Sequence, residues 1–285
     1  MLLRTGLASG LAVVLATAGF AQATDFTDLV QTGTAQAVQA AIDQGADVKA
    51  KGDNDATPLH LAALFNKDAD VIGVLVKAGA DVNARDINGA TALVDILEGS
   101  GFHADIVQAV VKTGADVNLP DNNGYAPIGL AISRKYPPIV IRLLINAGAR
   151  VTPSANQAPL VDALSNRYPA DIIGLLLLKG AKITDANANG VTPLMAALMN
   201  NATAGTVSRL LAAGADPNGK TRDGLSPLML AAYDDEDPAI LSTLMQAGAD
   251  PQIKDPNGMT AWNYAQMNPA LKGTAAVKAL EQPKN

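Results

Sequence analysis

The chain has 285 residues, of which 48% are hydrophobic and only 4% aromatic, and its formal net charge is −6. Such a chain is too apolar and too weakly charged to be disordered, and its acidic balance argues against a nucleic-acid-binding protein, which would carry a basic patch. The absence of cysteine excludes a disulfide framework, a thiolate metal site and a cysteine nucleophile. Few aromatic residues beside abundant alanine and glycine favour many thin, similar layers over one large core.

Residues 1–23 are typical of a secretory signal peptide. Arg4 precedes an uncharged, mostly apolar run, and the small residues Ala21 and Ala23 match the pattern of a cleavage site. The run is too short for a membrane-spanning helix, which needs ~20 apolar residues. We therefore expect cleavage between Ala23 and Thr24, rather than an uncleaved anchor or a buried helix. The mature protein is then expected in the periplasm, or alternatively secreted, without a membrane anchor.

An internal period close to 34 residues runs through the rest of the chain. The triplet Gly-Ala followed by Asp, Arg or Lys recurs at intervals of 32 to 35 residues. In most units Thr-Pro-Leu, or a close variant of it, follows twelve residues after that glycine. Two independent anchors that keep one period indicate a repeat architecture. The glycines of the first anchor are Gly45, Gly79, Gly114, Gly148, Gly180, Gly214 and Gly248.

Each anchor has a mechanical meaning, and together they predict one recurring unit. Thr57 before Pro58 is an N-cap followed by proline at the first helical position, where no N–H is needed. Gly79, after the apolar run that starts at Val71, is a left-handed helix stop. Turn-forming residues such as those at 86–89 lie between stop and start. Each unit is therefore expected to be a helix, a short loop, a second helix and a protruding hairpin-like finger.

One unit departs from this pattern. Only ten residues separate Gly148 from Ala158, where the other units have twelve, and the Asp-x-x-Gly turn is missing between them. The fourth finger is therefore expected to be shorter and irregular.

The segments TPLHLAA, residues 57–63, and VIGVLVKAGADVNARD, residues 71–86, show the unit most clearly. They closely resemble the ankyrin repeat family, and the resemblance covers essentially residues 25–282. It implies an all-α solenoid of about eight stacked helix pairs with hairpin-like fingers, whose usual activity is to bind other proteins. We expect a repeat domain at 24–285, with an N-terminal cap at 24–52, internal repeats at 53–254 and a C-terminal cap at 255–285.

No group of residues predicts catalysis, a metal site or a cofactor. His60 occupies the histidine of the family's Thr-Pro-Leu-His motif, which implies local hydrogen bonds at the helix start, and His103 has no second metal ligand near it. The segment 185–190 looks like the start of a calcium loop but lacks the glutamate at its twelfth position, so we interpret it as a finger turn. No Ser/His/Asp arrangement and no phosphate-binding loop is recognisable. We therefore expect a non-enzymatic protein.

Acidic residues occupy two unusual kinds of position. The run at 234–237 is expected to be a solvated loop with negative charge at a helix N-terminus, the alternatives being a docking patch for a basic partner or a weak cation site. Asp95 and Asp162 replace an apolar residue in the first helix of their units. They lie two units apart, and stacked helices are ~10 Å apart, so they cannot form a carboxylate pair. We expect each to be a satisfied polar residue at a helix edge.

The resemblance implies that partner contacts come from the fingers and the concave ends of the first helices. In the last units, the residue before the N-cap anchor and the residue after the first helix are apolar, often methionine. Such a stripe is typical of an adaptable binding surface, unless some of its side chains pack against the neighbouring unit. The candidates on this face are Tyr125, Val191, Met199, Leu225, Tyr233, Met259 and Met267.

A second candidate surface lies on the loops between the two helices of a pair. Arg-Lys-Tyr-Pro and Asn-Arg-Tyr-Pro repeat at an interval of 32 residues, so equivalent side chains are expected to stack beside each other. Tyrosine and arginine are common binding hot spots, and the alternative is a tyrosine that packs over its own helix pair. The candidates here are Arg134, Lys135, Tyr136, Arg167 and Tyr168.

These observations predict a periplasmic protein–protein interaction module, a scaffold or stabilising partner of another exported protein. The partner is expected to be a protein of unknown identity, not a nucleic acid, and the chain itself to be monomeric. Two alternatives stay open: an inhibitor or immunity protein that blocks a toxin or hydrolase, and a secreted effector that binds host proteins.

Overall fold

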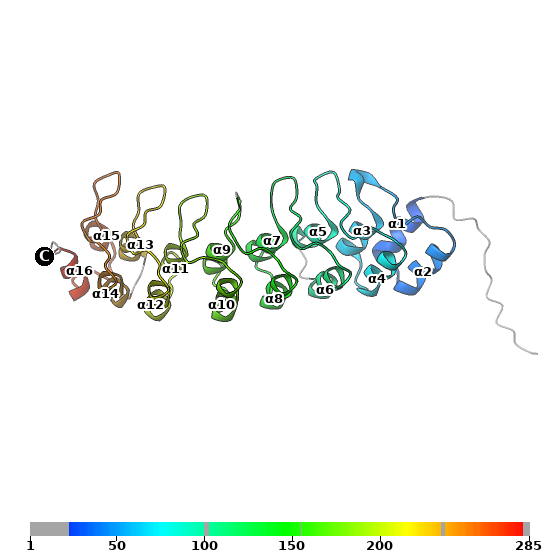
Figure 1. Cartoon of the computed structure of the whole chain (residues 1–285). Coiled ribbons are helices and arrows are strands. Elements are labelled where there is room, and N and C mark those ends of the chain that lie inside the picture. Colours follow the sequence, from blue (N-terminus) through cyan, green and yellow to red (C-terminus); the bar gives the residue numbers. More distant parts are fainter. Residues whose placement is uncertain (1–22, 100–102, 155, 235–236, 282–285) are drawn as a thin grey trace, which may run out of the picture.

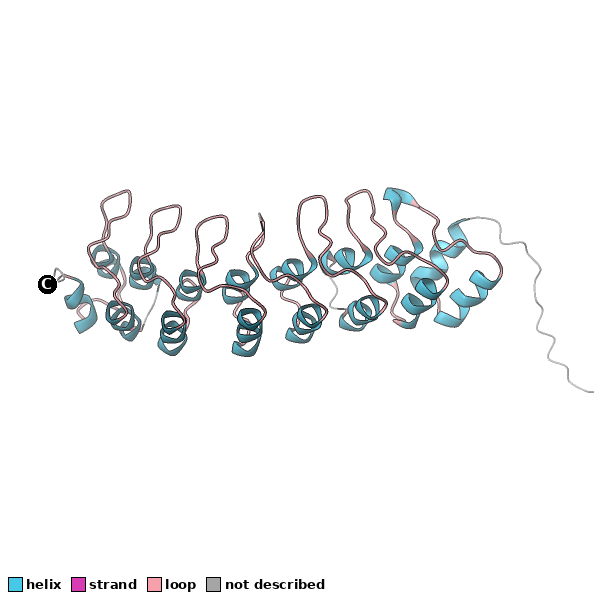
Figure 2. Ribbon diagram, in the orientation of Figure 1, coloured by secondary structure: helices cyan, strands magenta, loops and turns pink. Residues whose placement is uncertain are grey.

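The computed structural model describes residues 23–99, 103–154, 156–234 and 237–281. Within these residues it contains sixteen α-helices, a 3-10 turn at Asp53–Asp55 and no strand. Consecutive helices form pairs that are stacked in a single line, and the loops between pairs project from one edge of the stack as hairpin-shaped fingers (Figures 1 and 2). The all-α repeat solenoid with eight helix pairs is thus confirmed.

The helices form two rows. The first helices of the pairs lie nearer the fingers and pack against one another in series. They are α1 (Ala23–Thr32), α3 (Pro58–Phe65), α5 (Ala92–Glu98), α7 (Pro127–Ser133), α9 (Pro159–Ser165), α11 (Pro193–Leu198), α13 (Pro227–Asp234) and α15 (Ala261–Met267). The second helices are α2 (Ala35–Asp43), α4 (Asp70–Lys77), α6 (Ala104–Lys112), α8 (Pro138–Asn146), α10 (Ala170–Leu178), α12 (Ala204–Ala212), α14 (Pro238–Gln246) and α16 (Ala275–Leu280).

The predicted helix starts and stops are confirmed. The Thr91 and Thr192 side chains each accept a hydrogen bond from the backbone N–H three residues later, as N-caps do. The glycines of the recurring triplet all have positive φ, from 93° at Gly214 to 106° at Gly180. Because a side chain is strained in that left-handed region, glycine is the residue that ends each second helix at lowest cost.

Backbone hydrogen bonds join neighbouring fingers. The Asn122 N–H donates to the Asn88 carbonyl at 2.9 Å, and the Arg222 N–H donates to the Asn189 carbonyl at the same distance. The fingers are therefore not independent loops. They project as a row of hairpins along one edge of the stack (Figure 2).

The fourth finger, between α8 and α9, is irregular as expected. Its turn is closed by a hydrogen bond from the Ser154 N–H to the Gln157 carbonyl. The buried Gln157 side chain reaches back to the preceding repeat, where its amide oxygen accepts from the Ala126 N–H at 2.9 Å and its amide nitrogen donates to the Ala126 carbonyl at 3.1 Å. A side-chain amide here ties two repeats together.

The expected signal segment lies almost wholly outside the described residues, which begin at 23. Ala21 is outside them, whereas Ala23 and Thr24 are the first two residues of α1. Cleavage between Ala23 and Thr24 stays a prediction, as do the boundaries of the two caps. In the part of the chain that the structure describes, no helix is long and apolar enough to cross a membrane.

Candidate functional site

The last three repeats place large apolar side chains at one equivalent position. Met199, Tyr233 and Met267 lie at the ends of α11, α13 and α15, and their exposed fractions are 45%, 58% and 60%. We call these three residues the Met–Tyr–Met row. The Tyr233 ring meets the Tyr264 ring edge-on, with centroids 6.0 Å apart. Apart from Met199, the helix end of α11 is entirely buried, so the row stands on a rigid support.

The row is confined to one half of the stack. The same position in earlier repeats holds the exposed polar residues Glu98, Ser133 and Ser165, and the half-buried Leu64. An apolar surface therefore gives way to a polar one along the first helices. This contrast supplies matched positions for testing the row.

The neighbouring finger positions are less exposed than the sequence suggested. Val191 and Leu225 are half-buried and pack against the core, and Met259 is half-buried as well. Tyr125 is 38% exposed and lies one finger away from the irregular fourth finger. Val191 and Leu225 thus follow the alternative interpretation, in which a finger side chain packs against the neighbouring unit.

The structure contradicts part of the prediction that the interhelix loops form a second binding surface. Tyr136 is only 1% exposed, and its hydroxyl donates to the Ile96 carbonyl of the preceding repeat at 2.6 Å. The half-buried Tyr168 donates to the Tyr136 carbonyl at 2.6 Å. Tyr136 as a partner-binding residue is therefore wrong, because a buried side chain with an engaged hydroxyl offers no contact surface. Burial raises the pKa of Tyr136 and raises the pKa of Tyr168 to about 12.

The backbone N–H groups of the two tyrosines close the C-terminal ends of α7 and α9. The Tyr136 N–H donates to the Ala131 carbonyl and the Tyr168 N–H to the Ala163 carbonyl, each at 2.9 Å. These bonds close a Schellman motif, in which the residue before the donor is left-handed. Lys135 occupies that position, with φ 59°. The sequence does not predict this, because glycine or asparagine usually marks a left-handed helix end and Lys135 is neither.

The basic residues of these loops are exposed. Arg134 caps α7, Lys135 follows it, and Arg167 has the Lys135 position in the next repeat, with φ 57°. We call these three residues the cation ledge. The two ion pairs within the described residues are Lys51–Asp55 and Arg142–Asp171, so none involves the ledge. These exposed cations are the part of the loop prediction that the structure leaves at the surface.

The carboxylates of the first helices behave differently from each other. Asp162 accepts a hydrogen bond from the Ala158 N–H at 3.0 Å, as expected of a satisfied residue, and burial raises its pKa against that bond. Asp95 accepts no side-chain hydrogen bond within the described residues. Burial first, then the charges of Asp86 and Glu98, raise the pKa of Asp95 to about 7. The expectation that Asp95 is satisfied is thus not met.

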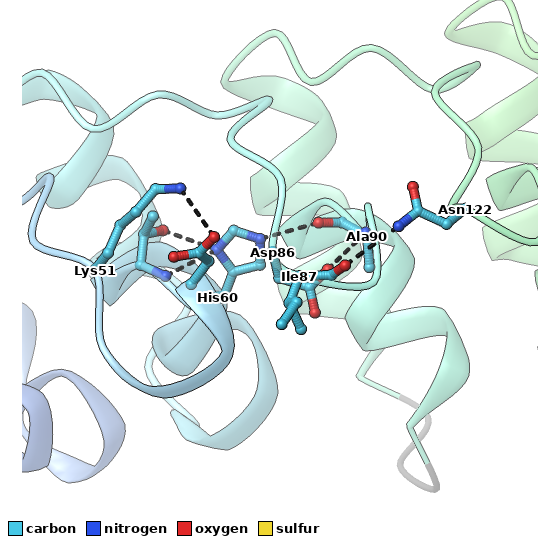
Figure 3. Close-up of polar contacts among 8 residues, drawn as sticks. Lys51, His60, Asp86, Ile87, Ala90 and Asn122 are labelled. Carbon is cyan, nitrogen blue, oxygen red and sulfur yellow. Dashed lines mark hydrogen bonds and ion pairs between the residues drawn. The ribbon is translucent and has the colours of Figure 1, made fainter.

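His60 is a structural link between repeats. Its Nδ1 accepts from the Thr57 N–H at 3.2 Å, so its Nε2 carries the proton and donates to the Ala90 carbonyl in the next finger at 3.2 Å (Figure 3). Asp86 closes that finger by accepting from the Ala90 N–H at 2.7 Å. Burial lowers the pKa of His60. The predicted local network is confirmed, with an added link to the next repeat.

The other polar candidates are ordinary parts of the repeats. Asp185 accepts from the Lys182 N–H and Asn187 accepts from the Val191 N–H, which makes this segment a finger turn. Asp237 caps α14, whereas positions 235–236 of the acidic run lie outside the described residues. Across the described ranges, no group of three or more His, Cys, Asp or Glu side chains could hold a metal ion.

Sequence reasoning missed a pocket in the first repeat. It has a volume of about 310 Å³ and lies between α1, the end of α2, the first finger and α3. Phe26, Leu29 and Leu61 line it together with the polar Gln44 and Lys51. The finger contributes small alanines to its lining, and the pocket lies at the opposite end of the stack from the Met–Tyr–Met row.

Comparison with known families settles the classification. The family model for ankyrin repeats in three copies matches residues 66–155, 93–187 and 160–255. The chain belongs to the ankyrin repeat family. The ankyrin repeat domain of human ASB11, solved as a crystal structure, is 19% identical, with a TM-score of 0.49 over 91% of this chain and 99% of that chain. No curated protein matches the chain in sequence.

Ankyrin repeats are protein–protein interaction modules, and proteins built from them are generally non-enzymatic. The stack offers two exposed features that sequence analysis had marked. One is the apolar Met–Tyr–Met row at the first-helix ends, and the other is the cation ledge on the interhelix loops. They differ in chemistry and lie on different repeats, so each can be tested separately.

Proposed function

We propose that this ankyrin protein is exported, is not an enzyme, and binds another exported protein through the Met–Tyr–Met row. Its role is that of a scaffold or stabilising partner. The observation that carries the proposal is the recurrence of a large, exposed apolar side chain at one position in three successive repeats. Grouped exposed apolar surface marks interaction sites, whereas apolar side chains scattered singly are ordinary.

The chemistry of the row suits a protein partner. Methionine adapts its shape to a surface at low cost, and tyrosine combines a large apolar area with a polar tip. Stacked helices are ~10 Å apart, so the three side chains form a line roughly 20 Å long. That length matches a single segment of a partner protein, such as one helix of about four turns.

The first experiment tests direct contact at the row. A photoreactive amino acid replaces Tyr233 in the full chain, and a second variant carries it at Ser165, the matched exposed position of an earlier repeat. We expect a defined crosslinked protein with the Tyr233 probe and no crosslink of that same protein with the Ser165 probe. Met199→Asp with Met267→Asp should abolish the capture of that protein. An equal yield from both probes, or capture that survives the double variant, would count decisively against the row.

The second experiment tests export. The full chain, including residues 1–23, is expressed with its own start and fractionated into cytosol and periplasm. Intact-mass measurement should find a periplasmic species that begins at Thr24. A chain that retains residues 1–23 in the cytosol would refute export while leaving the binding proposal intact.

One observation favours a second function, an inhibitor of a basic protein. The half-buried Asp95 carboxylate accepts no hydrogen bond within the described residues and lies near the like charges of Asp86 and Glu98. A basic side chain from a partner would relieve this repulsion. Charge-reversing Glu98→Lys should then weaken binding without affecting capture at Tyr233, and retention of full binding by that variant would remove this candidate.

A further inference from the structure

The loops that join α7 to α8 and α9 to α10 place positive charges at a costly backbone position. Lys135 and Arg167 are left-handed, with φ 59° and 57°. Asn201 has the same position in the next repeat, with φ 54° and the same closing bond, from the Ala202 N–H to the Ala197 carbonyl. Glycine and asparagine are the residues that this position favours. Two successive repeats thus carry a long cationic side chain where a cheaper residue would serve the fold.

No ion pair within the described residues accounts for these charges. The side chains of Lys135 and Arg167 are exposed and form no hydrogen bond or ion pair within the described part of the chain. Arg134 and Glu98 of α5 attract each other electrostatically, but the two form no ion pair. The ledge therefore stands as a local positive surface on a chain whose net charge is −6.

The ledge is held in place from beneath. The Tyr168 hydroxyl bonds the carbonyl of Tyr136, and the Tyr136 hydroxyl bonds Ile96, so the two loops are fixed to each other and to the preceding repeat. The residue just before each tyrosine is a ledge cation. A charged side chain on a loop that is already ordered loses less entropy on binding than one on a free loop.

We propose that Arg134, Lys135 and Arg167 form a second docking surface, which binds an acidic segment of a protein. Neighbouring repeats are ~10 Å apart, a spacing that carboxylates meet when they lie three residues apart in an extended chain, at about 3.3 Å per residue. An extended acidic segment can therefore contact both loops at once. The surface is independent of the Met–Tyr–Met row, so either proposal can fail without the other.

The test uses the full chain and a fluorescent peptide with glutamate at every third position and serine between. Anisotropy is measured at about 50 mM salt, where charges within one Debye length still interact. We expect the glutamate peptide to bind and a matched glutamine peptide to bind at least ~10-fold more weakly. Lys135→Asn with Arg167→Asn should weaken glutamate-peptide binding by roughly 3- to 10-fold. The melting temperature should stay equal or rise, because asparagine suits this backbone position better.

The matched control removes two exposed charges elsewhere. Lys77→Asn with Lys179→Asn changes the net charge by the same amount, on second helices away from the loops. An equal loss of binding in this variant would overturn the proposal in favour of a diffuse charge effect. A lower melting temperature of the ledge variant would show that the cations serve the fold. Binding of anionic lipid vesicles in preference to the glutamate peptide, lost in the ledge variant, would assign the surface to membranes and refute a protein partner.

Discussion

The Tyr168 hydroxyl donates a hydrogen bond to the Tyr136 carbonyl across a repeat boundary, at 2.6 Å. Tyr136 in turn reaches the Ile96 carbonyl one repeat earlier, also at 2.6 Å. The two bonds run in the same direction and join three consecutive repeats. In a solenoid, stability is the sum of repeat and interface terms, and these side chains act on the interfaces.

Removing either hydroxyl is expected to weaken the stack. Tyr136→Phe keeps the buried ring but leaves the Ile96 carbonyl without this donor, and loss of one buried hydrogen bond costs about 1–2 kcal/mol. Urea unfolding should show a lower midpoint with an unchanged slope. Tyr125→Phe is the control, since its side chain is 38% exposed, and it should leave the midpoint unchanged. Equal midpoints for wild type and Tyr136→Phe would mean that the bond contributes nothing.

The stability of the protein should depend on His60 below neutral pH. Burial holds the folded-state pKa of His60 below its ordinary value, so the unfolded chain binds a proton more readily. The contribution of neutral His60 is therefore present above the unfolded pKa of ~6.5 and is lost as the pH falls below it. Unfolding free energies should decline from pH 8 to pH 5 when they are measured in an Asp95→Asn background, which removes the opposite trend of that carboxylate.

Two variants separate His60 from other groups. His60→Asn should be less stable at pH 8, by about 1 kcal/mol or more, because the links to Thr57 and Ala90 are weakened. It should also lose the decline between pH 6.5 and pH 5. His103→Gln, the matched change at the second histidine, should keep that decline. A decline that persists in His60→Asn would assign it to another group.

Sequence patterns foretold the parts of this structure that recur within one unit. The N-cap at Thr91 and the helix end at Gly79 are local features, because they depend on the dihedral angles of a few residues. The structure confirms both. The exposure of Tyr233 also followed from its place at a helix end. These features are set by chain geometry, which a repeated sequence displays several times.

The failures lie at contacts between units. Tyr136 is predicted at the surface because it lies in a loop of its own repeat. Its contact with the Ile96 carbonyl belongs to the preceding repeat, which the pattern of one unit does not show. Val191 and Leu225 lie on fingers, yet both are partly buried against the hydrophobic core. Register between units depends on side-chain sizes in both, which no single unit displays.

Neutralising Asp95 is expected to stabilise the protein at neutral and higher pH. Burial, reinforced by the charges of Asp86 and Glu98, raises its pKa to about 7 in the folded state. The folded chain then binds a proton that the unfolded chain releases, so ionisation costs stability as the pH rises from the unfolded pKa near ~3.9 to about 7. Since the side chain is partly exposed, we expect Asp95→Asn to gain about 1–2 kcal/mol at pH 8.

The pH dependence of the gain identifies its cause. Most of the advantage of Asp95→Asn should be gone by pH 4, where wild-type Asp95 is protonated in the folded state and about half protonated in the unfolded state. Asp162→Asn is the matched control, because Asp162 accepts a hydrogen bond from Ala158 and should gain less or lose stability. A gain that is the same at pH 4 and pH 8 would point to a cause other than ionisation.

The irregular fourth finger depends on the absence of a side chain at Gly129. A Cβ at that position would lie 2.1 Å from the Gln157 amide, so Gly129→Ala must displace it. The displaced amide gives up its two bonds to Ala126, each worth about 1 kcal/mol. We expect a loss of about 1–2 kcal/mol in urea unfolding, although alanine favours the helix. Adding Gln157→Ala should cost little more, because its bonds are already lost. Additive losses in the double variant would contradict this coupling, since residues that share an interaction must show non-additive effects.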